Sequence, residues 1–102
     1  MERTEYLEKV KKLLKEMKKI VNQHVNAKIY VFGSIVKGNF SIGLSDVDIA
    51  IVSDEFKNRE KKLEVYDILF SKYFDYPFEF HLLTEKQWNF YLRFIKKDFI
   101  EI

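Results

Sequence analysis

Residues 28–52, KIYVFGSIVKGNFSIGLSDVDIAIV, hold two apolar runs separated by a polar loop. The runs at residues 28–32 and 46–52 predict two strands. Ser34 could begin a turn or short helix, and the Asn, Ser and Gly residues of 39–45 are typical of a loop. Only about a dozen residues join the strands, too few for a full crossover helix, so we expect a mixed sheet rather than an all-parallel one.

The flanking sequence adds helices and one further strand. Apolar residues recur at steps of three and four over residues 4–23, which predicts an amphipathic helix. Residues 60–74 predict a second helix, and FEFHLL at 78–83 predicts a third strand. Thr84 and Gln87 then form the capping box of a last helix. The apolar side of the second helix consists of Leu63, Tyr66, Phe70 and Tyr73. This order predicts an α/β protein in which helices flank a small mixed sheet.

Composition limits the function classes. A chain of 102 residues makes one domain, residues 1–102. The absence of cysteine excludes disulfides, thiol catalysis and zinc–thiolate sites. The charged N-terminus is no signal peptide, and no apolar run approaches the roughly 20 residues that span a bilayer, so we expect a cytoplasmic protein without a membrane partner. A net charge of +2 does not favour nucleic-acid binding.

Asp46 and Asp48 are the first candidate site residues. Side chains two apart in a strand share a face, with Cα atoms roughly 7 Å apart. Two such carboxylates repel each other unless a cation lies between them, and hard oxygen ligands suit Mg²⁺. The Gly33-Ser34 turn can face the same cleft, because glycine lets the backbone approach a phosphate closely. The alternative is a surface turn in which both aspartates are solvated.

Glu79 is the third candidate. Phe78, Phe80 and Leu82 mark one face of their strand as core, which leaves Glu79 and His81 on the other face. A buried carboxylate without a partner would be costly, so either this face is open to water or the charge has a partner. A metal shared with the two aspartates would be such a partner. His81 is a weaker candidate, as a neutral hydrogen-bonding residue.

The compound pattern GSIVKG…SDVD resembles the signature of the minimal nucleotidyltransferases, the smallest members of the DNA polymerase β-like nucleotidyltransferase superfamily. That signature has Gly-Ser, a short helix, Ser-Asp-x-Asp, and a third acidic residue on a later strand. The matching residues are Gly33, Ser34, Ser45, Asp46 and Asp48, with Glu79 as the candidate for the third carboxylate. The match covers residues 28–84, and it implies a polymerase β-like core.

The resemblance also implies a mechanism. Asp46 and Asp48 would hold Mg²⁺ bridging the triphosphate of ATP, and with Glu79 they would hold a second ion that activates an acceptor hydroxyl. The nucleotide-binding residues would be Gly33, Ser34, Lys37 and Ser45. Many family members carry arginine where this chain has Lys37. Lysine is a point charge without the planar fork of arginine, which leaves room for altered nucleotide handling.

The acceptor is implied by the resemblance alone. Minimal nucleotidyltransferases are often paired with a small all-helical HEPN subunit as a toxin–antitoxin system, in which the transferase adds AMP to a tyrosine of the toxin. We therefore expect a protein adenylyltransferase with an antitoxin role. Two alternatives stay open. The first is a non-catalytic module that binds nucleotide and neutralises a helical partner by contact, and the second is transfer to RNA or a small molecule.

The last helix predicts a partner surface. Trp88, Leu92 and Ile95 fall on one side and should pack on the sheet, whereas Phe90 and Phe94 fall nearly opposite, among basic side chains. Exposed aromatics of this kind resemble a binding patch for a helical partner or a second copy of the chain. The alternative is that the C-terminal segment DFIEI, which the sequence leaves ambiguous, folds back and covers the two rings.

Overall fold

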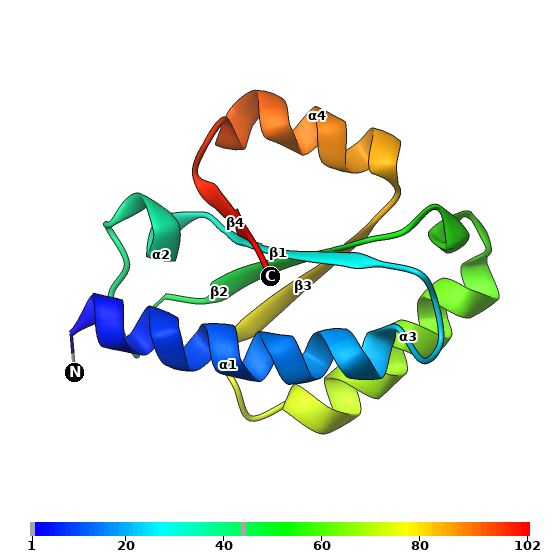
Figure 1. The fold of residues 1–102 in the computed structure, drawn as a ribbon, viewed down its shortest axis with the longest axis horizontal. Helices are drawn as coiled ribbons and strands as arrows, with labels where there is room; N and C mark the ends of the chain where they lie inside the picture. The colour runs from blue at the N-terminus through cyan, green and yellow to red at the C-terminus, as the bar shows by residue number, and fades with distance from the viewer. Residues whose placement is uncertain (1, 44) are drawn as a thin grey trace.

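The chain forms a mixed β-sheet covered by helices on both faces (Figure 1). The computed structural model describes residues 2–43 and 45–102. Its elements are α1 (Arg3–Val21), β1 (Lys28–Phe32), α2 (Ser34–Lys37), β2 (Val47–Val52), the 3-10 turn η1 (Asp54–Lys57), α3 (Arg59–Tyr73), β3 (Phe78–Leu83), α4 (Glu85–Ile95) and β4 (Phe99–Glu101). The strand order is β3-β2-β1-β4, with β1 antiparallel to β2 and β4, and β2 parallel to β3. The predicted mixed sheet flanked by helices is confirmed.

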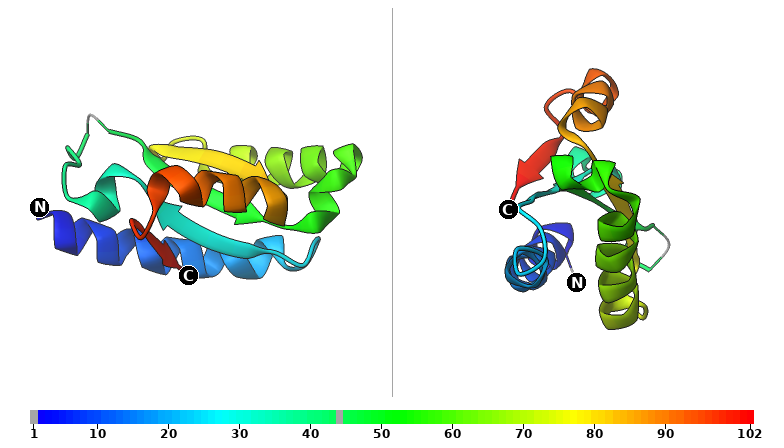
Figure 2. Two further views of the ribbon diagram at one scale, coloured as in Figure 1. Left: turned by 90° about the horizontal axis from the view of Figure 1, so that it is seen from above. Right: turned by 90° about the vertical axis from the view of Figure 1, so that its right-hand side faces the viewer.

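The sheet separates two apolar layers because side chains alternate along each strand. Helices α1 and α3 lie on one face and α4 lies on the other (Figure 2). The larger layer packs Leu14 and Met17 of α1 against Ile29 and Ile49 of the central strands, all four at 0% exposure. The smaller layer packs Trp88 of α4 on β1 and β2 through Tyr30, Phe32, Ala50 and Val52. The α4 face is the face that carries the candidate site.

The predicted apolar side of α3 is wrong for three of its four residues. Their exposures are 50% for Leu63, 42% for Tyr66 and 58% for Phe70, whereas Tyr73 is buried. The row that faces the sheet is Val65, Leu69 and Tyr73, at steps of four. Apolar residues occur on several sides of α3, so periodicity does not choose the buried side. Packing against β3 and η1 makes that choice.

The ends of the elements follow the sequence closely. The capping box of α4 is present, with the Thr84 hydroxyl accepting from the Gln87 amide at 3.3 Å. The ambiguous C-terminal segment forms β4 at the sheet edge and leaves Phe90 and Phe94 exposed. Strand β2 begins at Val47 and not at Asp46 as predicted. No helix in the described ranges has the length and apolarity needed to cross a membrane.

Candidate active site

Two carboxylates lie side by side on the α4 face of the sheet. Asp48 of β2 is paired with Glu79 of the parallel strand β3, and on its other side with Phe32 of the antiparallel strand β1. Residues that pair across strands point to the same face. The register therefore places the charges of Asp48 and Glu79 next to each other, an arrangement that is unfavourable without a cation or a hydrogen-bond donor.

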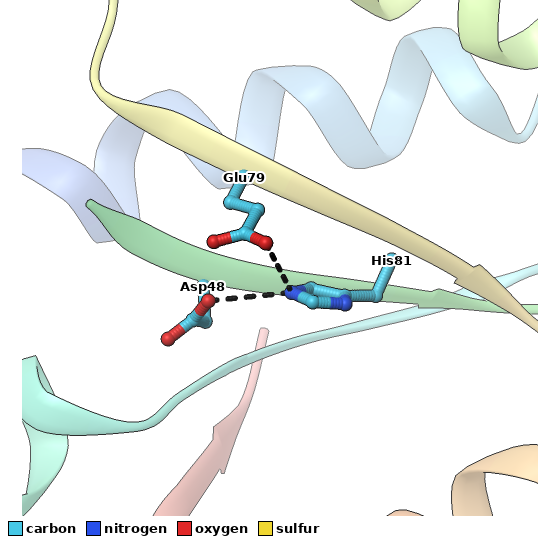
Figure 3. A group of neighbouring side chains, drawn as sticks. All are labelled: Asp48, Glu79 and His81. Carbon is cyan, nitrogen blue, oxygen red and sulfur yellow. Dashed lines mark hydrogen bonds and ion pairs between the residues drawn. The ribbon is translucent and has the colours of Figure 1, made fainter.

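His81 completes this group from the next outward-facing position of β3. Its Nε2 lies 3.3 Å from Oδ1 of Asp48 and 3.9 Å from Oε1 of Glu79 (Figure 3). The side chains of Asp48, Glu79 and His81 are 27%, 56% and 20% exposed. Each offers one ligand atom, and these atoms all lie within 4.8 Å of one another. Two carboxylates open to solvent suit a hard divalent cation, so the residues present fit such a metal.

Gly33 brings the backbone turn into direct contact with this group. It is the N-cap of α2 and has φ 84° and ψ −147°, a conformation that side chains rarely adopt. A Cβ at this position would lie 2.6 Å from Oδ2 of Asp48. The predicted proximity of the Gly-Ser turn and this aspartate is therefore present in the fold, and only glycine permits it.

The other predicted site residues lie around this centre. Ser34 begins α2 and is half-buried, and Lys37 ends α2 and is exposed. The Ser45 hydroxyl accepts from the Ser41 amide at 3.2 Å, which closes the loop before β2. Asp46 is exposed immediately before β2, and in the described part of the chain it does not belong to the group formed by the other two carboxylates. The roles of these residues toward a nucleotide or metal stay predictions.

Two aromatic residues extend the site beyond the predicted set. The hydroxyl oxygen of Tyr91 in α4 lies 3.4 Å from Nδ1 of His81. The Phe32 ring packs on the His81 ring with centroids 5.2 Å apart. The alternation of side chains along the strand already predicted that His81 shares a face with Glu79. No local pattern indicates Tyr91, because its position depends on how α4 docks on the sheet.

Comparison with known proteins assigns the fold and the family. A sequence profile described as nucleotidyltransferase domain matches residues 10–102. This chain belongs to the nucleotidyltransferase domain family. A solved structure of a candidate nucleotidyltransferase is 49% identical, with a TM-score of 0.72, over 89% of this chain and 95% of that one. A candidate nucleotidyltransferase from Sulfolobus solfataricus is similar in fold, with 22% identity, a TM-score of 0.60, and coverage of 88% and 76%. No curated protein sequence matches the chain.

Family membership gives the carboxylate group a chemical meaning. Nucleotidyltransferase domains generally use divalent metals, and here Asp48 and Glu79 on adjacent strands could offer oxygen ligands to such an ion. At the Gly33 turn the missing side chain lets the Asp48 carboxylate lie directly against the backbone. Nucleotidyl transfer in general is the activity that this family and this donor set support.

Proposed function

We propose that this protein transfers AMP from ATP to a hydroxyl acceptor in a reaction that requires Mg²⁺. The observation that carries the proposal is the convergence of Asp48 and Glu79 beside the Gly33 turn. Carboxylates of adjacent strands with a tight backbone turn against one of them provide a place for a cation and for the phosphates it neutralises.

The acidic residues have separate roles in this proposal. Asp46 and Asp48 would hold the metal at the triphosphate, and Glu79 with both aspartates would hold a second ion on the acceptor side. Glu79 suits that side because its side chain is 56% exposed and within reach of an incoming acceptor. Divalent ions, when bound, supply positive charge that offsets the phosphates and lowers the pKa of a bound hydroxyl.

Four further residues would bind the nucleotide. The Gly33 backbone lies next to the Asp48 carboxylate, and Ser34 follows it as the first residue of α2. Lys37 is exposed one helical turn later and would supply a point charge to a phosphate. Ser45 accepts a hydrogen bond from Ser41, which leaves its own hydroxyl proton for a phosphate oxygen.

The proposed transfer step forms one bond to phosphorus and breaks another. The acceptor oxygen forms a bond to the α-phosphorus of ATP, the bond from that phosphorus to the bridging oxygen breaks, and pyrophosphate leaves. The hydroxyl proton passes to water. The acceptor we propose is a tyrosine of a small all-helical HEPN-type protein, which gives this chain an antitoxin role. This part of the proposal rests on the resemblance of GSIVKG…SDVD to the minimal nucleotidyltransferases.

The decisive experiment follows the label of ATP. The purified chain, a purified HEPN-type partner and Mg²⁺ are incubated with ATP labelled at the α-phosphate or, separately, at the γ-phosphate. Transfer of the α-label alone, with a partner mass increased by one AMP moiety, supports the proposal. Asp46→Asn and Asp48→Asn should abolish labelling without changing the thermal melt of the metal-free protein. Normal turnover by either variant would remove that residue from the site.

A contact-only module is the second candidate function, and the exposed α4 aromatics favour it. Phe90 and Phe94 are 55% and 74% exposed, as a protein-binding surface would require. In that case no label would pass to the partner, and Asp48→Asn would bind and neutralise the partner as well as the parent does. The same experiment therefore separates the two candidates. If label appeared on RNA or on a small molecule, that molecule and not a protein would be the acceptor.

A further inference from the structure

Three groups from three elements form a continuous chain of polar contacts. Tyr91 of α4 contacts Nδ1 of His81 at 3.4 Å, and Nε2 of the same ring contacts Oδ1 of Asp48 at 3.3 Å. The other carboxylate oxygen of Asp48, Oδ2, is the one that faces Gly33. The two oxygens of Asp48 therefore have different neighbours, since one contacts the imidazole and the other faces the turn.

The donors and acceptors of this chain fix where its protons lie. An ionised aspartate only accepts hydrogen bonds, so Nε2 of His81 must carry the proton in its contact with Oδ1. In a neutral imidazole the other nitrogen is then an acceptor, so the Tyr91 hydroxyl donates to Nδ1. The ionised Asp48 thus selects the ring form, and the Tyr91 hydroxyl satisfies the nitrogen that this form leaves as an acceptor. A ring nitrogen that carries a proton has no lone pair for a metal.

Packing holds the ring in this orientation. The His81 side chain is 20% exposed, with its ring centroid 5.2 Å from that of Phe32 and 5.7 Å from that of Tyr91. His81 is paired on the neighbouring strand with Ala50, a fully buried residue whose small side chain leaves room for the imidazole ring on this face. The ring therefore cannot turn freely to present a different nitrogen to Asp48.

We propose that His81 and Tyr91 are positioning residues, which hold Oδ1 of Asp48 and so leave Oδ2 for the metal beside the Gly33 turn. Neither residue is a metal ligand in this arrangement, although His81 lies among the ligand atoms. This role rests on the proposed metal-dependent function of the site. Outer contacts of this kind fix the orientation of a ligand, and losing one typically lowers metal affinity about 10–100-fold.

The first test determines which nitrogen of the His81 ring carries a proton. Nitrogen-15 spectra of the imidazole at about pH 8, above the ordinary pKa of histidine, report which ring nitrogen carries a proton. The expected result is a proton on Nε2 of His81 and none on Nδ1, unchanged when Mg²⁺ is added. A proton on Nδ1, or loss of the Nε2 proton on adding Mg²⁺, would overturn the proposal. This measurement needs no variant and no activity.

The second test measures Mn²⁺ affinity by calorimetry in five folded variants. His81→Leu should weaken binding about 10–100-fold, whereas His81→Gln keeps a donor nitrogen and should bind nearly as the parent does. Tyr91→Phe should weaken binding in the parent but have no effect in the His81→Gln background, since the ring nitrogen that its hydroxyl contacts is then absent. Tyr66→Phe removes an exposed hydroxyl on α3 and is the matched control.

The outcomes separate this role from the proposed function. Equal losses in His81→Gln and His81→Leu would make His81 a ligand and overturn the positioning role. A parent protein that binds no Mn²⁺ would overturn both proposals. Variants that behave as expected in a protein that transfers no label would support the positioning of Asp48 and contradict only AMP transfer.

Discussion

Gly33 lies so close to Asp48 that a Cβ on the glycine would meet Oδ2 of the carboxylate at 2.6 Å. A loop separates the two residues in the sequence, but Gly33 directly follows β1 and Asp48 is the second residue of the antiparallel neighbour β2. Because the two strands are antiparallel, the end of β1 and the start of β2 lie at the same end of the sheet, which is why the Gly-Ser turn and the aspartate meet. The backbone of one strand and the charge of the next thus border the same space.

Gly33→Ala should therefore damage the metal site more than the fold. Gly33 and Gly38 both have positive φ, 84° and 104°, so alanine at either position should cost about 1–2 kcal/mol of stability or more. Only at Gly33 does the new methyl group displace Asp48, because Gly38 has no heavy atom within 4 Å of that position. Calorimetry with Mn²⁺ should show a loss of at least about tenfold for Gly33→Ala alone. Equal affinities in the two variants would mean that Asp48 moves aside without consequence.

Glu79→Gln should lose AMP transfer more than it loses ATP binding. The substitution keeps the size of a half-exposed side chain and removes the charge assigned to the acceptor side. Transfer by this variant is expected to fall by about 100-fold or more, the scale of removing one electrostatic contact in a transition state. Titration with Mg²⁺–ATP and initial rates give the comparison, with exposed Glu101→Gln as control. Unchanged binding and unchanged turnover would make Glu79 an ordinary strand residue.

Tyr73→Phe should stabilise the protein. The Tyr73 hydroxyl is buried and has no hydrogen-bond partner among the described residues, and burial is the main cause that raises its pKa. Removing an unsatisfied buried hydroxyl recovers its desolvation penalty, about 1 kcal/mol or more, which is worth about 4–8 °C in Tm for a domain of this size. Thermal melts of Tyr73→Phe and of exposed Tyr66→Phe test this. A lower Tm for the first variant would reveal a partner for the hydroxyl.

The contacts of Glu55 should make stability depend on pH at both extremes. Lys61 at 2.7 Å and then the Asn26 amide at 2.6 Å hold the pKa of the Glu55 carboxyl below its ordinary value, and Glu55 raises the pKa of Lys61. A lowered carboxyl pKa stabilises the fold above its unfolded value of 4.5, and this is lost as pH falls through the folded pKa. A raised lysine pKa stabilises below its unfolded value of 10.5, and this is lost as pH rises through the folded pKa.

The free energies of unfolding of the parent and of Glu55→Gln should therefore differ most between these limits. The difference should shrink below about pH 4.5 and again above about pH 10.5. Urea unfolding across the pH range measures it. A difference that stays constant through the acidic limb would mean that the contacts act through packing rather than charge.

Periodicity within one strand was enough to predict which side chains of β3 share a face of the sheet. The alternation in FEFHLL correctly separated Phe78, Phe80 and Leu82, which face the α1 and α3 layer, from Glu79 and His81 on the α4 face. Glycine followed by serine at a strand end also predicted the turn at Gly33. These features depend on neighbouring residues, so local geometry determines them.

Features that depend on docking between elements could not be predicted in this way. The buried row of α3 is chosen by its contact with β3 and η1, and three of the four residues assigned to that row are exposed. The contact of Tyr91 with His81 requires both the capping of α4 and its crossing of the sheet. The C-terminal strand forms because β1 offers a free edge, and the short segment itself has no strong pattern.

The exposed pair Phe90 and Phe94 should be a protein-binding patch. Their rings are 5.4 Å apart, and the Arg93 guanidinium lies 5.9 Å from the centroid of the Phe90 ring. Because α4 packs on the sheet through Trp88, replacing both phenylalanines with serine should leave the Tm nearly unchanged while weakening association with a helical partner or a second copy. Sedimentation velocity of the chain alone and with a HEPN-type partner measures the association.

The exposed aromatics of α3 provide the matched control for this pair. Phe70 in α3 and Phe74 directly after it are 58% and 72% exposed. Helix α3 lies on the face of the sheet opposite α4 (Figure 2), so serine at both positions removes a similar apolar area from a different face. If association falls only in the α4 variant, the loss is specific to that surface and not to surface hydrophobicity in general. If it falls only in the α3 variant, the interface lies on the α1 and α3 layer. A double variant of α4 that unfolds would show that the two rings stabilise the helix itself, which their exposure argues against.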